Sequence, residues 1–148
     1  MKKNKHHIGQ SMIEFALIFP ILIFLLLGFL DIGRAIFYYS SLTNAVREAT
    51  RFAIVNRNAI EDACNNPADN ILQDVVLDFA FGLTNTPNPL TKQDINIPCP
   101  LNNPNQSITI EATYAFIPIT PGIAQLIGNG TGIDLVAQST MRIAGGSR

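Results

Sequence analysis

One apolar run limits what this chain can fold into more than any other feature. Phe15 to Leu30 is a stretch of sixteen residues without a charged or strongly polar side chain, and the stretch counted from Met12 has nineteen residues. At about 1.5 Å of rise per residue, a helix of this length nearly spans the hydrocarbon core of a bilayer. Three lysines within the first five residues precede the run, so the positive-inside rule places the N-terminus in the cytoplasm. We therefore expect a single membrane span, with the rest of the chain outside.

Two alternatives compete with a membrane span. A cleaved secretory signal peptide has a shorter apolar region that ends in small residues, whereas here Asp31-Ile-Gly-Arg-Ala35 follows without a clear A-x-A site. A buried core helix of a soluble protein would carry a polar stripe, and no such stripe interrupts the run. Both alternatives fit the sequence less well than a span does.

Composition fits a small exported protein with one anchor. The chain has 148 residues, enough for about one domain, and the part after residue 30 is rich in Asn and Pro, so its core is modest. The net charge is −1, and without the first nine residues it becomes −4, with seven basic against eleven acidic residues. Neither value favours nucleic-acid binding. Cys64 and Cys99 both lie beyond the span, where an even count predicts one disulfide; two free thiols are the alternative.

Helical periodicity continues past the apolar run. Apolar residues recur at three- and four-residue spacing as far as Ala53, and the opposite face carries most of the arginines. We predict one helix of about forty-five residues, apolar all round over 10–30 and amphipathic over 31–58. Asp31 with Arg34, and Glu48 with Arg51, are expected as i,i+3 pairs. Pro20 removes a backbone hydrogen bond and predicts a kink near residues 16–20.

The rest of the chain predicts one short helix and a small sheet. The helix is expected over Ala68–Phe81, with Asp69 or Asn70 as its cap and Gly82 at its end. A loop over 84–91 leads to a short strand at Ile95–Ile97, which Pro98 ends. One helical turn at Ile123–Ile127 is possible between the two longer strands described next.

Two longer segments alternate with a period of two, which predicts an antiparallel sheet with one covered face. The amphipathic part of the long helix is the natural cover. The predicted fold class is thus α+β, with three to four strands. We expect a leader over 1–9, a spanning or filament-core helix over 10–30, its amphipathic continuation over 31–58 and an exterior domain over 59–148. The residues expected to face inward are Ile108, Ile110, Ala112, Tyr114, Phe116, Ile133, Leu135, Ala137, Met141 and Ile143.

Few residues favour catalysis. The only two histidines, His6 and His7, lie in the leader, which argues against His-dependent hydrolysis, and there is no calcium-loop motif. Arg47 and Arg51 are expected on a solvated or salt-bridged helix face rather than in an anion site. We therefore expect no enzymatic activity, no metal and no cofactor.

Glu14 lies inside the apolar stretch, five residues after Gly9. A carboxylate deep in a spanning helix costs roughly 2.5–3.5 kcal/mol even on the most lenient scale. Cleavage after Gly9 would create an α-amino group on Gln10, largely cationic at neutral pH. Because Gln10 and Glu14 are i and i+4, the amine and the carboxylate would lie on one helix face. The charge then becomes half of a pair, within one chain or between neighbouring chains.

At these residues the chain resembles the TadE-like proteins of the tight-adherence pilus system, a branch of the type IV filament superfamily. The resemblance implies a prepilin-type peptidase that acts after Gly9, Glu14 as the position-five glutamate, and a role as pilin or pseudopilin. It also implies identical or related pilin subunits and a pilus assembly platform in the cytoplasmic membrane as partners. The matching segments are Gly9–Ala16, Pro20, Asp31–Arg34, Ala45–Ala53, Ile108–Tyr114, Phe116–Pro121 and Leu135–Arg142.

The leading hypothesis is a structural subunit, held in the cytoplasmic membrane, trimmed at the leader and built into an extracellular adhesive filament by helix packing. A filament needs a heterologous contact that does not close, which bundled apolar helices can supply. The alternative is a single-span accessory protein that keeps its leader and binds a secretion partner or ligand through its exterior domain. An anchored enzyme is a third hypothesis, without a candidate site. The residues expected to set assembly and register are Gln10, Glu14, Phe15 and Pro20.

Overall fold

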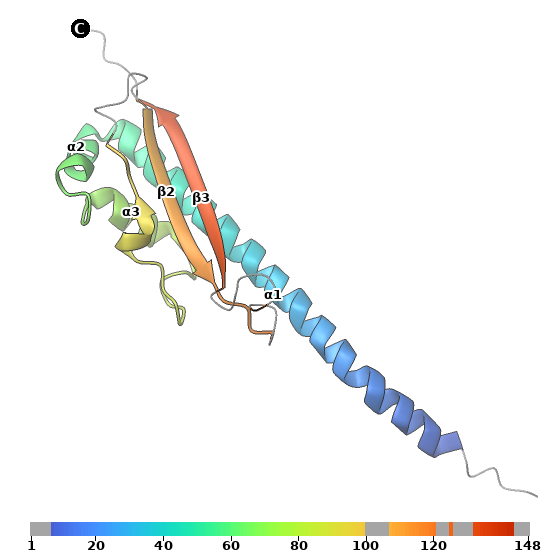
Figure 1. The fold of residues 1–148 in the computed structure, drawn as a ribbon. Helices are drawn as coiled ribbons and strands as arrows, with labels where there is room; N and C mark the ends of the chain where they lie inside the picture. Colours follow the sequence, from blue (N-terminus) through green and yellow to red (C-terminus); the bar gives the residue numbers. More distant parts are fainter. Residues whose placement is uncertain (1–6, 100–106, 121–124, 126–131, 144–148) are drawn as a thin grey trace, which may run out of the picture.

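A single long helix forms the axis of the molecule, and a small α+β domain is packed around one end of it (Figure 1). The computed structural model describes residues 7–99, 107–120, 125 and 132–143. Helix α1 spans His7–Val55, a length of 49 residues. Its N-terminal half protrudes from the domain, and its C-terminal half lies along the sheet (Figure 1). The predicted α+β class, with a long N-terminal helix and an antiparallel sheet, is confirmed.

The C-terminal half of α1 is built to be covered. Its buried face repeats at three- and four-residue spacing, as the amphipathic pattern predicts. Many of these residues are alanines, and their small side chains let the sheet and α3 approach the helix closely. The residues with no solvent exposure at all are Leu42, Ala45, Val46, Ala49, Thr50 and Ala53.

Helix α1 ends earlier than predicted, at Val55 rather than at residue 58. Asn56 takes an extended conformation, with φ −113° and ψ 92°, and a separate helix, α2, follows over Arg57–Asn65. Helix α2 was not predicted, because apolar spacing continues through Asn56 and no Pro or Gly marks the break between the two helices. The change of direction lets α2 bury Ala59, Ile60 and Ala63.

Helix α3 spans Ile71–Phe79, within the predicted 68–81. It begins with a capping box, in which the Asn70 side chain accepts from the Gln73 backbone N–H and the Gln73 side chain accepts from the Asn70 N–H. Asn70 is thus the cap, and Asp69 is not. Beyond the helix, Gly82 has a φ of 78°, a left-handed conformation that Gly adopts without steric cost.

The sheet has three antiparallel strands in the order β1-β2-β3. Strand β1 is Ile95–Asn96 and follows the short 3-10 helix η1, Lys92–Asp94; β2 is Ser107–Phe116 and β3 is Ile133–Arg142. The inward residues predicted for β2 are all buried. Opposite them, β3 places Ile133, Leu135, Ala137 and Met141 on the same face, from the pairing Phe116↔Ile133 to the pairing Ile108↔Met141.

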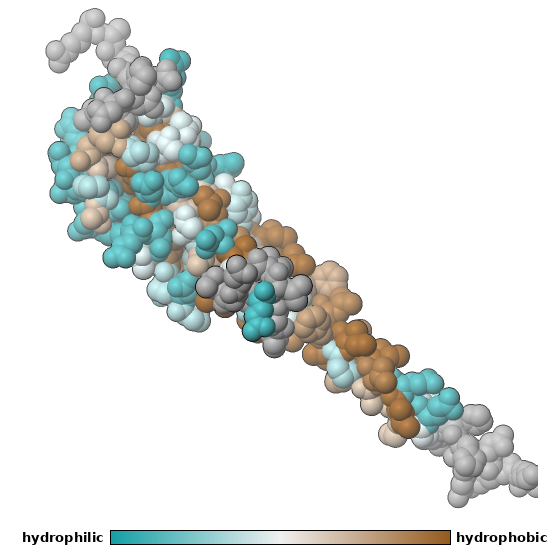
Figure 2. All heavy atoms as spheres, viewed as in Figure 1, coloured by the Kyte–Doolittle hydropathy of each residue, from teal (hydrophilic) through white to brown (hydrophobic). Residues whose placement is uncertain are grey.

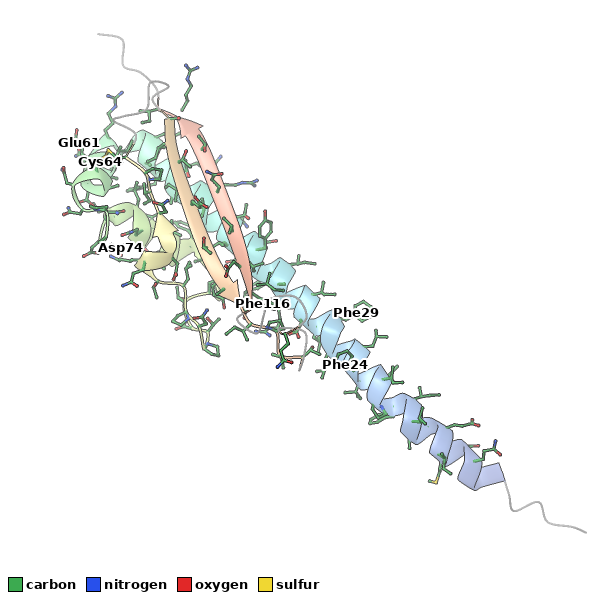
Figure 3. The ribbon with its side chains drawn as sticks, viewed as in Figure 1. Phe24, Phe29, Glu61, Cys64, Asp74 and Phe116 are labelled. Atoms are coloured by element: carbon green, nitrogen blue, oxygen red, sulfur yellow. A yellow bond between two sulfur atoms is a disulfide. The ribbon has the colours of Figure 1, made fainter. Side chains whose placement is uncertain are left out.

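The predicted disulfide is present and joins α2 to the segment after β1. Cys64 and Cys99 are bridged, with their Cα atoms 5.1 Å apart. Figure 3 labels Cys64 on α2, at the end of the domain remote from the protruding helix. A short helix that shares few contacts with α1 is in this way tied covalently to the sheet.

Two other predictions stay predictions. Helix α1 continues through Pro20 as one element, and the kink expected there stays a prediction. Most of the leader lies outside the described residues, as does the helical turn expected at Ile123–Ile127 apart from Gln125, which is helical.

Candidate assembly surface

The protruding half of α1 is the most exposed apolar surface among the described residues. Every residue from Gly9 to Leu26 is exposed, including Met12 at 71%, Phe15 at 65% and Leu22 at 60%. Figure 2 shows brown residues along this part of the helix, in contrast to the largely teal domain. The helix is long and apolar enough to cross a membrane. Such a surface needs a non-aqueous environment, either lipid or other helices.

Gly9, Gln10 and Glu14 lie together in the first two turns of α1. All three are exposed, and Gln10 and Glu14 are one turn apart on the same face. Within the described part of the chain, no cation forms an ion pair with Glu14. The carboxylate therefore projects from an apolar helix without an ion-pair partner from residues 7–99.

Gly9 is not required by the packing of the fold. A Cβ atom built at this position meets nothing within 4 Å, and no positive φ is recorded there. A helical Gly without a steric reason is unfavourable by roughly 1 kcal/mol relative to Ala. Packing among the described residues therefore does not explain the Gly at position 9. A requirement set by another molecule would explain it.

Phe15 and Pro20 lie further along the same exposed surface. The rings of Phe15 and Phe19 are 5.4 Å apart, which joins two aromatic side chains one turn apart. Gln10, Glu14, Phe15 and Pro20 are thus all solvent-exposed on one helix. None of them contributes to the core of the domain.

Asp31 has a structural role that the sequence did not predict: its carboxylate binds the chain after β2. This residue is only 5% exposed, and it forms the expected pair with Arg34, whose Nη1 lies 3.3 Å from Asp31 Oδ1. It also accepts hydrogen bonds from Ile119 N–H at 2.9 Å and from Thr120 N–H at 2.8 Å. The Thr120 hydroxyl donates a third, at 2.6 Å. One carboxylate therefore fastens the chain after β2 to α1.

Arg34 extends this junction to the sheet. Its guanidinium carbon lies 5.6 Å from the centroid of the Tyr38 ring and 5.4 Å from that of Phe116, distances typical of cation–π contacts. Figure 3 shows Phe116 at the base of the sheet, and Phe29 further along the protruding helix. An acidic residue at the end of an apolar run indicates a membrane border. No local sequence signal predicts its hydrogen bonds to Ile119 and Thr120, which lie 88 and 89 positions away.

The two arginines singled out in the sequence lie on the surface of α1. Arg47 and Arg51 are exposed on α1, beside a shallow groove that Phe79 and Met141 also line. Arg51 pairs with Glu48 at 3.8 Å. Among the described residues, no group of three or more His, Cys, Asp or Glu side chains is arranged to hold a metal ion.

Comparison with protein families gives one match. The family model described as TadE-like protein matches residues 9–51, which include Gly9, Glu14, the whole apolar run, Asp31 and most of the buried face of α1. Comparison with curated proteins and with solved structures returns no match for this chain. Over residues 9–51, this chain is similar to the TadE-like proteins.

Proposed function

We propose that this chain is a structural subunit, a pilin or pseudopilin, of a tight-adherence pilus. In this proposal residues 10–30 hold the protein in the cytoplasmic membrane, and a prepilin peptidase removes residues 1–9. The assembly platform in that membrane then builds the trimmed chain into an extracellular filament. The observation that carries the proposal is an apolar helix, exposed on every side. It carries one carboxylate, without an ion-pair partner among the described residues, a few residues after a Gly that the packing does not require.

The exposed helix supports packing against other copies. Before assembly, lipid covers the apolar side chains of residues 12–30; in a filament, neighbouring helices replace the lipid. The outer domain buries only the C-terminal half of α1, so the N-terminal half is free to pack against neighbours. A helix that meets a different surface of the next copy forms a heterologous contact, which propagates instead of closing.

Glu14 supports a defined register. A carboxylate in an apolar environment is unfavourable by roughly 2.5–3.5 kcal/mol when it is alone. The amine that trimming would create on Gln10, in the same chain or in its neighbour, offsets this penalty through a charge-assisted hydrogen bond. A helix that slides away from its position leaves the charge unpaired, so the pair favours one axial arrangement of subunits.

We further propose that the protein has no catalytic activity and no nucleic-acid partner. The side chains gathered in the described structure serve packing, capping and ion pairing. The partners proposed are copies of this chain or related pilins, the peptidase and the assembly platform.

Replacement of Glu14 tests the assembly role. We expect Glu14→Ala to leave the outer domain folded, because Glu14 contacts none of it, and to accumulate in the membrane while surface filaments become scarce. Electron microscopy of cells, alongside blots of membrane fractions, measures both quantities. Glu48→Ala is the matched control, since it removes a carboxylate from the same helix but from its outer part, and we expect normal filaments.

A single-span accessory protein predicts the opposite result. Neither Glu14→Ala nor Glu14→Gln would then change filament number, membrane abundance or binding through the exterior domain. Normal filaments in both variants would reject the proposed role of the carboxylate and favour the accessory function.

A further inference from the structure

Two isoleucines at the base of the outer domain break the pattern of the strand that precedes them. Along β2 the outward positions are polar at Thr109, Glu111 and Thr113, and the small Ala115 follows them. Beyond the strand the alternation continues, with Phe116, Pro118 and Thr120 buried. The outward residues there are Ile117, 52% exposed, and Ile119, 66% exposed. A polar surface thus becomes apolar at one end of the domain.

The position of these isoleucines relative to the apolar run is fixed. The Ile119 backbone N–H donates to Asp31 Oδ1 at 2.9 Å, and Thr120 makes two further bonds to the same carboxylate. Asp31 is the first residue after the nineteen-residue stretch that starts at Met12. At about 1.5 Å per residue that stretch is about 28 Å long, close to the hydrocarbon thickness. If this stretch spans the hydrocarbon core, Ile119 lies where that core ends and the headgroup region begins.

The adjacent turn of α1 carries two exposed isoleucines beside Asp31 and Arg34. Ile32 is 58% exposed and Ile36 is 62% exposed, so apolar side chains continue for more than a turn beyond Leu30. Ile117 and Ile119, which we call the basal pair, are thus held at the level of Asp31, at the end of the helix segment that lipid would cover in a membrane anchor. Because Asp31 holds the chain at residues 119 and 120, the basal pair cannot easily move away from this level.

We propose that the basal pair inserts into the interface of the bilayer. The outer domain would then contact the membrane surface directly, in addition to being anchored by the spanning helix. The partner is the lipid surface of the leaflet on the side of the outer domain. This inference depends on anchoring by α1 but not on the assignment as a pilin, because an accessory protein with the same anchor would have the same contact. Short apolar segments at this depth add to membrane attachment in proportion to the area they bury.

The absence of tryptophan from this chain permits a direct test. Ile119→Trp and Ile117→Trp each place a single tryptophan in the basal pair, at positions exposed enough to accept it. The full-length variants are reconstituted in phosphatidylcholine vesicles, with or without bromine on the acyl chains. Bromine quenches tryptophan only at close range, so the loss of emission reports contact with lipid.

Two matched variants calibrate the measurement. Phe29→Trp, at a position 65% exposed within the apolar run, should be strongly quenched. Val55→Trp, at a position 86% exposed and about 36 Å along the helix from Asp31, should emit at long wavelength without quenching. We expect both basal variants to be quenched, more by bromine near the headgroup than by bromine near the bilayer centre, with emission shifted to shorter wavelength than that of Val55→Trp.

Three results would overturn the inference. Emission and quenching equal to those of Val55→Trp would place the basal pair in water. Short-wavelength emission without bromine quenching would assign its cover to a second copy of the chain. Absence of quenching in Phe29→Trp would show that the span itself is not in the bilayer, which would remove the basis of the proposal. The first two results leave the proposed function unaffected, whereas the third would also contradict its membrane anchor. Filament formation is tested separately by the Glu14 variants.

Discussion

Asp31 separates two environments along α1. On its N-terminal side the helix side chains are exposed, and on its C-terminal side one face of the helix is buried beneath the sheet and α3. The carboxylate itself accepts from one guanidinium, two backbone amides and one hydroxyl. A buried charge is tolerated when it is fully hydrogen-bonded. Here Arg34 is a local donor, and the other three donor groups belong to residues 119 and 120, 88 and 89 positions away. One side chain therefore decides where the outer domain begins on the helix.

Asp31→Ala should destabilise the outer domain. The substitution leaves the buried Thr120 amide and hydroxyl without an acceptor, and each buried polar group left unpaired costs about 1–3 kcal/mol. Urea unfolding of the full chain in detergent measures this loss, followed by near-ultraviolet circular dichroism. The edge-to-face Tyr38 and Tyr114 rings, whose centroids are 5.5 Å apart, supply the signal.

Glu48→Ala controls for the removal of a helical carboxylate. It breaks an exposed i,i+3 pair with Arg51, worth about 0.2–0.5 kcal/mol. Equal losses of stability in the two variants would contradict the assignment of Asp31 as the residue that fastens the segment after β2.

Gly9→Leu should block removal of the leader without disturbing the fold. A Cβ atom at this position meets no neighbour within 4 Å, and Leu favours a helix by about 0.8–1 kcal/mol more than Gly does. Intact-mass measurement of protein from the membrane fraction should therefore show the full-length chain, still folded. A mature chain that starts at Gln10 in this variant would contradict the idea that a peptidase requires the Gly.

At the scale of the elements, α2 depends on its connections more than the other helices do. It is nine residues long, too short to be stable alone in water, and three buried side chains hold it on the domain. The Cys64–Cys99 bridge links it to the end of β1 across a sequence separation of 35 residues. The Asp62 carboxylate on α2 also accepts from the Ile71 N–H at 2.9 Å, at the start of α3.

Replacement of both cysteines by serine should destabilise the outer domain. By the chain-entropy estimate, a bridge that closes a loop of this length contributes roughly 3–4 kcal/mol. The midpoint of urea unfolding should fall, and α2 should exchange its amide hydrogens before the β2–β3 pair does. An unchanged midpoint, or uniform exchange in the two elements, would show that the bridge does not hold α2 in place.

At the scale of the whole molecule, periodicity predicted most of the elements. The three- and four-residue spacing of apolar side chains gave α1 and α3, and the alternation in Ser107–Phe116 and Ile133–Arg142 gave the two long strands and their inner face. Two features could not be predicted from periodicity. The break at Asn56 lacks a Pro or Gly, and the bonds from residues 119 and 120 to Asp31 depend on tertiary approach. Periodicity reports local conformation and burial, but it does not report which distant backbone amide meets a given carboxylate.

The two ends of α1 have different purposes in this account. One end is buried and organises a small domain, and the other end presents a bare apolar surface with the junction at Gly9 and the carboxylate of Glu14. The central claim is that the bare end is trimmed and buried again among the helices of a filament.

The most direct test is the intact mass of this chain in filaments sheared from the cell surface. The account predicts that the chain is present in the sheared fraction and begins at Gln10, with Cys64 and Cys99 still bridged. A chain that is absent from that fraction, and is recovered only from membranes with residues 1–9 intact, would contradict it.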